Sequence, residues 1–196
     1  MGWIELFEWR WPAAREAFEK AVDLDRNNVY ALHGYGDYLT ITRNLEEGLS
    51  YVRRVGKKDP FAPLSTIPLV THLFFMRRYD DAITEAQKLL ELDPNFPVHG
   101  WLARIYWQQG RYEAARREYR IAWRRDSKRL RAFKRGYAEI GPKGGMLAIA
   151  ERLADQSERV YVNPFVIASA FARSGAFKHA MRWLERAAEA RAPELI

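Results

Sequence analysis

Four histidines in this 196-residue chain could provide ligands for a transition metal. They are His33, His72, His99 and His179, and they fall on four different predicted helices. Zinc sites bring three or four ligands together, often as pairs a few residues apart on one element. In our interpretation, no histidine has a carboxylate or a second histidine at that spacing on its own helix. The sequence therefore predicts no metal site, and we expect no cofactor.

The sequence contains no motif typical of a catalytic nucleophile or of a phosphate-binding loop. The chain has no cysteine, which excludes a thiolate nucleophile and a disulfide framework. Ser65, Ser169 and Ser174 lack the glycine-flanked elbow that exposes a catalytic serine. The segment GPKGG, Gly141–Gly145, lacks the Walker spacing and the following Ser or Thr of a phosphate-cradling loop. We predict that the chain is not an enzyme.

Positive charge is concentrated in residues 111–135, which we name the basic band. It holds eleven Lys or Arg and three acids, a local +8, whereas the other residues hold 21 basic and 22 acidic side chains. The cations that could form a binding surface are Arg116, Arg117, Arg120, Arg124, Arg125, Lys128, Arg131, Lys134 and Arg135. Such a surface suits an acidic protein, an anionic membrane or nucleic acid.

A solvated outer helix face is the interpretation that we favour for the basic band. Ala115, Tyr119 and Ala122 share a helix with part of it, and we expect them to occupy the buried side. An acidic protein or membrane partner comes second. Nucleic acid comes last, because no RNA-reading repeat code or recognition-helix pattern accompanies the charge.

The elements that must position these residues repeat along the chain. RRYDDAITEAQKLLELDPN, residues 77–95, and GRYEAARREYRIAWRRDS, residues 110–127, align with an offset of 33 residues. The alignment pairs Tyr79 with Tyr112, Ala82 with Ala115 and Asp93 with Asp126. The same spacing recurs from Trp11, Leu45 and Phe177, and a second helical pattern precedes each copy apart from the one at Trp11. The chain is therefore predicted to be a series of helical hairpins.

The residue types in these helices indicate how the hairpins pack. Small residues such as Gly36 and Ala103 let paired helices approach closely, and large ones such as Tyr106 and Phe171 fill the space beside them. Each apolar set recurs at helical spacing and forms one stripe. A single hairpin cannot bury its stripe alone, whereas stacked hairpins can, which is the arrangement of a solenoid.

This pattern resembles the tetratricopeptide repeat, W-x2-L-G-x2-Y, then A-x3-F, then P over 34 residues. The resemblance implies an all-α, right-handed superhelix of about five and a half hairpins, in a single array over residues 1–196. The expected repeats are a partial one at 1–28, then 29–62, 63–95, 96–129, an irregular 130–160 and 161–194. In the irregular repeat we expect Gly141–Gly145 to form a long, loose turn before a helix over residues 146–158.

The two ends of the chain are similar to a bacterial subgroup of these domains. FEWRWPAAREAFEKAVDLDRN near the start and ERVYVNPFVIASAFARSGAFKHAMRWLERAAEARAPELI at the end look like the tetratricopeptide region of TolB-like and winged-helix regulatory proteins. The resemblance implies a segment of a longer bacterial protein, located in the cytoplasm or, alternatively, the periplasm. No run of 18 apolar residues and no signal peptide is present.

Tetratricopeptide arrays usually bind peptides on a concave face lined by the first helix of each hairpin. The resemblance places Tyr30, His33, Asp37, Ile67, Thr71, Phe74, Arg104, Trp107 and Phe165 on that face. Phe74 and Trp107 stand where packing does not require an aromatic residue, and such residues anchor interfaces. The alternative is that these side chains pack against neighbouring helices. Of the positions that clamp a carboxylate in chaperone-binding relatives, only Arg104 carries a suitable side chain.

We therefore expect a scaffold or regulatory module that binds a protein or peptide on its concave face. A nucleic-acid-associated regulator fragment that uses the basic band is the first alternative. Self-association is the second, because Trp3, Trp9 and Trp11 lie at one end of the array. A homodimer through exposed end faces would follow from it.

Overall fold

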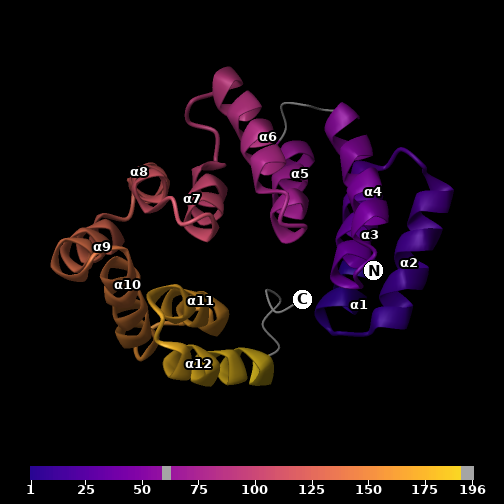
Figure 1. Cartoon of the computed structure of the whole chain (residues 1–196). Helices are drawn as coiled ribbons and strands as arrows, with labels where there is room; N and C mark the ends of the chain where they lie inside the picture. Colours follow the sequence, from indigo (N-terminus) through magenta and orange to yellow (C-terminus); the bar gives the residue numbers. More distant parts are fainter. Residues whose placement is uncertain (59–62, 191–196) are drawn as a thin grey trace. The chain divides into compact units, whose positions relative to one another are not determined.

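Helices account for every regular element in residues 1–58 and 63–190, the part of the chain that the computed structural model describes. The chain divides into two compact units, Met1–Ala122 and Trp123–Ile196. Figure 1 shows the helices of each unit lying beside their neighbours in chain order. The all-α prediction is confirmed, and the helices form the antiparallel hairpins of an α-solenoid.

Unit 1 contains the helices that carry most of the predicted concave face. They are α1 (Gly2–Phe7), α2 (Trp11–Leu24), α3 (Val29–Ile41), α4 (Leu45–Lys58), α5 (Pro63–Phe75), α6 (Tyr79–Leu92), α7 (His99–Gln108) and α8 (Tyr112–Ala122). Each helix contacts the next, and α1, α3, α5 and α7 also contact one another in succession. The first helices of the hairpins therefore form one row.

A helix before Trp11 was not expected from the sequence, and that prediction is wrong. Residues Gly2–Phe7 form α1, which packs on α2 and α3. Trp3 explains the packing, because its ring meets Phe18 at 5.6 Å and the imidazole of His33 at 5.5 Å, centroid to centroid. One of the tryptophans proposed for an end face is thus mainly a contact inside unit 1.

The turn inside each hairpin uses one residue with positive φ. These residues are Trp9, Arg43, Arg77, Gly110, Gly141 and Gly175. Their spacing along the chain is 34, 34, 33, 31 and 34 residues, so the repeat is present in the backbone as well as in the side chains. Left-handed backbone suits glycine, and three hairpins use another residue there at a cost of roughly 1–2 kcal/mol.

The turns between hairpins depend on Asp and Asn side chains. Asp25 and Asp93 follow the ends of α2 and α6, and their Oδ1 atoms accept hydrogen bonds from the backbone N–H groups of Asn27 and Asn95 at 2.9 and 2.8 Å. Asn28 then caps the start of α3 by accepting from Ala31 N at 3.1 Å. These Asp and Asn side chains therefore end one helix and orient the next.

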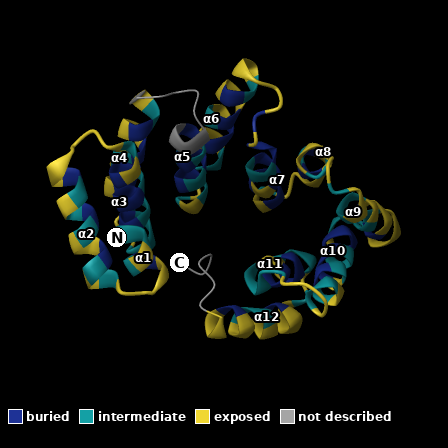
Figure 2. Ribbon diagram, turned by 180° about the vertical axis from the view of Figure 1, so that it is seen from behind, coloured by how far each residue is buried: buried dark blue, intermediate teal, exposed yellow. Residues whose placement is uncertain are grey.

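The buried stripes lie where the helices of each hairpin face one another, as the dark blue residues in Figure 2 show. Ala82, Ala86 and Leu89 of α6 are buried, and so are Ala115 and Tyr119 of α8. Ala122, which was expected on the buried side, is exposed at the last residue of α8. The stripe of α8 therefore ends one helical turn earlier than predicted.

Unit 2 contains α9 (Ser127–Ile140), α10 (Pro142–Ser157), α11 (Pro164–Ser174) and α12 (Phe177–Glu189). The long, loose turn expected at Gly141–Gly145 is wrong, because only Gly141 separates α9 from α10 and Pro142 already begins α10. Gly144 belongs to the helix and faces Gly136 of α9. A Cβ atom added at Gly136 would lie 2.2 Å from the Gly144 carbonyl oxygen. These glycines allow two helices to touch, which their sequence context does not reveal.

Candidate functional site

Aromatic rings gather where α5 and α7 lie side by side in unit 1. The ring of Phe74 lies 5.6 Å from the ring of Trp101 and 5.9 Å from that of Tyr79, centroid to centroid. Phe75 lies 6.3 Å from Trp101 and keeps 60% of its surface exposed. The guanidinium carbon of Arg104 stands 4.6 Å from the centre of the Trp101 ring. We name Phe74, Phe75, Trp101 and Arg104 the aromatic surface.

The aromatic surface contains two predicted residues and two that the sequence reasoning missed. Phe74 and Arg104 were predicted, and the structure brings them together through Trp101. Trp101 precedes Arg104 by three residues, a spacing that puts both on one side of a helix and could have identified the pair. Phe75 is the most exposed ring of the group, but its exposure depends on neighbouring helices that periodicity alone does not place.

Trp107 is part of the core of unit 1, and its prediction as a groove anchor is contradicted by its burial. Only 8% of its surface is exposed. Its ring lies 4.9 Å from the ring of Tyr112 and 6.4 Å from that of Tyr119, both on α8. Packing therefore does require an aromatic residue at this position, because the ring fills the space between α7 and α8.

The α3 part of the predicted face consists of one exposed ring and two half-buried polar groups. Tyr30 is 68% exposed at the start of the helix. His33 Nε2 lies 3.3 Å from Asp37 Oδ2 on the same helix, and His72 Nε2 of α5 lies 3.4 Å from Asp37 Oδ1. The expectation that no carboxylate stands at ligand spacing from a histidine on its own helix is therefore wrong for His33.

Burial sets the protonation of this His33–Asp37–His72 cluster. It raises the pKa of Asp37 to about 7, because the carboxylate loses its hydration. It lowers the pKa of His33 to about 4, with a smaller contribution from His72, and it also lowers the pKa of His72. Between about pH 4 and pH 7, Asp37 and His33 are therefore both uncharged, with the proton on Asp37.

The other residues predicted for the concave face are only partly exposed. Ile67 and Thr71 of α5 are half-buried, and the Thr71 hydroxyl donates a hydrogen bond to the Pro68 carbonyl oxygen at 2.9 Å. Thr71 thus bonds its own helix. Phe165 is half-buried on α11 of unit 2.

The basic band falls on both units. Its α8 members in unit 1 are Arg116, Arg117 and Arg120, of which Arg116 pairs with Glu113 at 3.2 Å and is half-buried. In unit 2 the band has seven members, of which Arg129 is half-buried and the other six are exposed, namely Arg124, Arg125, Lys128, Arg131, Lys134 and Arg135. Lys128, Arg131 and Arg135 line a groove of about 1170 Å³ along α9 and α10. Part of the band is therefore the wall of a concave surface.

The family model of the tetratricopeptide repeat matches residues 2–63 and 68–129. The chain belongs to the tetratricopeptide repeat family. The matched residues include α1 and every member of the aromatic surface.

Solved structures support the same fold. MamA MSR-1 C2 is 20% identical in sequence with a TM-score of 0.53, over 94% of this chain and 93% of that chain. MamA AMB-1 P212121 is 19% identical with a TM-score of 0.54, over 96% and 94% of the two chains. No curated protein sequence matches the chain significantly. The TM-scores and the coverage show that the tetratricopeptide repeat chain shares its fold with these structures. At identities this low, the likeness extends to the fold alone.

The described residues of this tetratricopeptide repeat protein contain neither a metal-binding group of side chains nor a membrane-spanning helix. Among residues 1–58 and 63–190, no group of three or more His, Asp or Glu side chains is arranged to hold a metal ion, the His33–Asp37–His72 cluster included. Within the same ranges, none of the helices combines the length and the apolar character that a membrane span needs.

Proposed function

We propose that the chain is an interaction module that holds a protein or peptide segment on the aromatic surface of α5 and α7. The observation that carries this proposal is Phe75, a ring with 60% of its area in water beside Trp101 and Arg104. Covering such a ring removes apolar area from water, which stabilises the complex by about 25 cal/mol per Å² of buried area. The tetratricopeptide repeat family supports a protein partner.

The chemistry of the aromatic surface defines the segment that it would hold. Aromatic and arginine side chains dominate the binding energy of protein interfaces. Arg104 is already held against Trp101, so less side-chain entropy is lost when it meets a carboxylate. The fitting segment carries an apolar side chain for Phe75 and an acidic residue close to it. A scaffold or regulatory role would suit such a surface.

Peptides selected by phage display against the wild-type chain would test the proposal. Dissociation constants of the selected peptides would be measured for the wild type, Phe75→Ser and Phe177→Ser. Phe177 is a matched control, because its ring is 68% exposed on α12 of unit 2. We expect Phe75→Ser to weaken binding about tenfold or more, the loss typical of an interface anchor. Equal affinities for the wild type and Phe75→Ser would refute the proposal.

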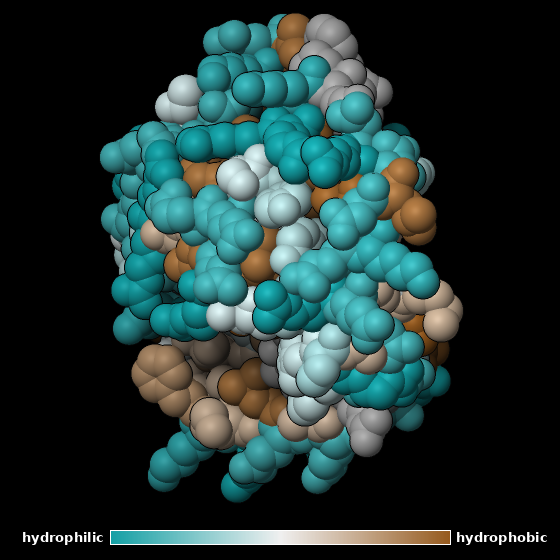
Figure 3. All heavy atoms as spheres, turned by 90° about the vertical axis from the view of Figure 1, so that its right-hand side faces the viewer, coloured by the Kyte–Doolittle hydropathy of each residue, from teal (hydrophilic) through white to brown (hydrophobic). Residues whose placement is uncertain are grey.

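Self-association through α1 is a second candidate, supported by exposed apolar side chains. Met1, Ile4, Phe7 and Trp9 are 86%, 54%, 42% and 37% exposed. Figure 3 views the face that α1 and α2 form, and hydrophobic groups gather along its lower edge below a mainly hydrophilic surface. A second copy of the chain could cover them. Light scattering of the wild type and of Phe7→Ser would decide, since a monomeric wild type at high concentration excludes this candidate.

A further inference from the structure

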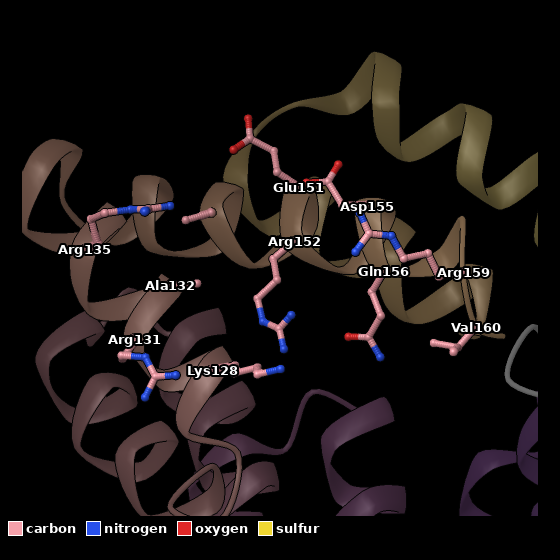
Figure 4. A pocket seen from close by; sticks show the side chains of 11 residues that line it. Lys128, Arg131, Ala132, Arg135, Glu151, Arg152, Asp155, Gln156, Arg159 and Val160 are labelled. Atoms are coloured by element: carbon pink, nitrogen blue, oxygen red, sulfur yellow. The ribbon is translucent and has the colours of Figure 1, made fainter.

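The groove along α9 and α10 is a concave and strongly charged surface of unit 2. Lys128, Arg131 and Arg135 line it from α9, at a spacing of three and then four residues that places them on one helix face. Arg152 lines it from α10, and Arg159 lines it just beyond the end of that helix. Figure 4 shows these side chains around the groove, with the ends of Arg152 and Lys128 pointing toward each other. Cations therefore converge on one space.

The groove has more positive than negative charge. Five cationic side chains line it, against the two carboxylates of Glu151 and Asp155, which leaves an excess of three positive charges. In the described part of the chain, no ion pair joins either carboxylate to one of the five cations, and Arg152 Nε is buried without a hydrogen-bond partner. A buried charged donor without an acceptor is costly, and a bound anion would relieve that cost.

Arg129 of α9 is repelled by some of the same positive charges. Arg129 of α9 is half-buried, and burial lowers its pKa, with further lowering by the charges of Arg152 and Arg173 and an opposing effect of Asp126. Arg129 keeps an ion pair with Asp126 at 3.4 Å. The cations of α9 and α10 are thus close enough to repel one another, and an anion in the groove would offset that repulsion.

We propose that the α9–α10 groove binds an acidic peptide segment of a partner protein. Carboxylates of the segment would pair with Arg131, Arg135 and Arg152. Arginine suits such pairing, since its planar guanidinium can donate two parallel hydrogen bonds to one carboxylate. Because α9 rises about 1.5 Å per residue, its three cations extend over roughly 10 Å. Acids spaced three to four residues apart on a peptide helix match that length.

The composition of the lining favours a peptide over nucleic acid. Glu151 and Asp155 lie on one wall of the groove and would repel a continuous phosphate backbone. A peptide can instead place a lysine opposite these two carboxylates. The lining residues include no aromatic side chain, whereas proteins that hold single strands stack bases on aromatic rings. The groove shares no residue with the aromatic surface of unit 1, so the two proposals can fail independently.

Three labelled probes would test the proposal against the whole chain. The first is a 14-residue peptide, by design with Glu at every third or fourth position and one central Lys, the second is the same peptide with its order scrambled, and the third is a 14-nucleotide single-stranded DNA. Affinities would be measured by fluorescence anisotropy at low and at physiological salt. We expect the ordered peptide to bind most tightly.

Charge-reversal variants identify the groove as the site. Arg131→Glu with Arg135→Glu should weaken peptide binding by at least roughly tenfold, because repulsion replaces two charge-assisted pairs. The matched control is Lys178→Glu with Arg182→Glu, the same charge change at two exposed positions on α12. It should retain most of the affinity, as should Phe75→Ser. Circular dichroism would verify folding, and neutral Arg131→Gln with Arg135→Gln would replace the reversed pair if that pair misfolds.

The opposite substitution tests the role of the acidic wall. Asp155→Lys should strengthen binding of a peptide whose central Lys is replaced by Glu, and weaken binding of the original peptide. No binding of either peptide, equal loss in the α12 control, or tighter binding of the DNA that is lost with Arg131→Glu and Arg135→Glu would each overturn the proposal. The last result would assign the groove to nucleic acid.

Discussion

The carboxyl Oδ1 of Asp37 on α3 lies 3.4 Å from Nε2 of His72 on α5. His72 Nδ1 lies 2.8 Å from the Pro68 carbonyl oxygen, which only accepts, so Nδ1 carries the imidazole proton. Nε2 of the neutral ring then presents a lone pair to Asp37. A protonated carboxyl can donate to that lone pair, whereas a carboxylate cannot. The raised pKa of Asp37 and the lowered pKa of His72 both favour this neutral pair.

Replacing Asp37 by Asn should change how stability depends on pH. The carboxyl group has a pKa of about 7 in the folded chain and about 3.9 in the unfolded chain. Between these values the folded state holds one more proton, so this group lowers stability as the pH rises toward 7. Asn has a similar shape, can donate to His72 and does not titrate. Thermal unfolding should therefore show the melting temperature of Asp37→Asn rising relative to the wild type between pH 5 and pH 8.

His33 and His72 provide the internal control for that measurement. Their lowered pKa values make the unfolded state take up protons first as the pH falls below about 6.5, so these groups destabilise the chain in acid. Both histidines remain in Asp37→Asn. A difference in melting temperature between the variant and the wild type that stays constant from pH 5 to pH 8 would contradict the buried, protonated Asp37.

Adding a methyl group at Gly136 should destabilise unit 2. The new Cβ would lie 2.2 Å from the carbonyl oxygen of Gly144, a backbone atom that cannot turn aside. Overpacking of this kind costs about 1–3 kcal/mol. Gly100 of α7 is the matched control, since a Cβ there has no atom within 4 Å. Gly100→Ala should be neutral or stabilise by up to about 1 kcal/mol through helix propensity. Urea unfolding monitored by circular dichroism would measure both, and equal effects would argue against the close α9–α10 contact.

The sequence predicted the hairpins because their signal is local and repeated. The aligned tyrosines, Tyr79 and Tyr112, are the first residues of α6 and α8, and α6 ends at Leu92, directly before the aligned Asp93. Helical spacing and turn residues act within a few positions of the chain, so each copy of the repeat supports the interpretation of the others. The boundary at Gly141–Gly145 failed because glycine in a turn and glycine at a helix contact look alike until the partner Gly136 is known.

The candidate site was harder to predict because exposure depends on neighbouring helices. Trp107 and Trp101 both lie on α7, six residues apart, yet Trp107 is buried against α8 and Trp101 remains half-exposed beside α5. Residue type could not separate the two. The groove of unit 2 is a similar case, because the sequence showed the charge of the basic band but not that Arg152 and Arg159 would face it.

Truncating Trp107 should lower the free energy of unfolding and should leave the binding surface unchanged. Removing a buried aromatic side chain costs about 3–5 kcal/mol, because a cavity remains among its neighbours. The rings that would lose contacts are those of Tyr112 and Tyr119. Phe75→Ser, at an exposed position, should change the free energy of unfolding by only about 0.5 kcal/mol. Thermal unfolding of both variants would compare them. A Trp107→Ala variant that melts like the wild type would restore this ring as a candidate groove residue.

Exchanging residues at the hairpin turns should shift stability in opposite directions. Arg77 and Gly110 occupy equivalent turns with φ of 59° and 72°. A left-handed conformation costs a residue with a Cβ atom about 1–2 kcal/mol. Glycine avoids that cost, but its greater freedom in the unfolded chain offsets part of the gain in stability. We expect Arg77→Gly to stabilise by about 0.5 kcal/mol and Gly110→Ala to destabilise by about 1 kcal/mol. No Cβ contact interferes at Gly110, since no atom lies within 4 Å of the added group. Urea unfolding would measure both changes, and a shared sign would show that side-chain contacts, not backbone conformation, control these turns.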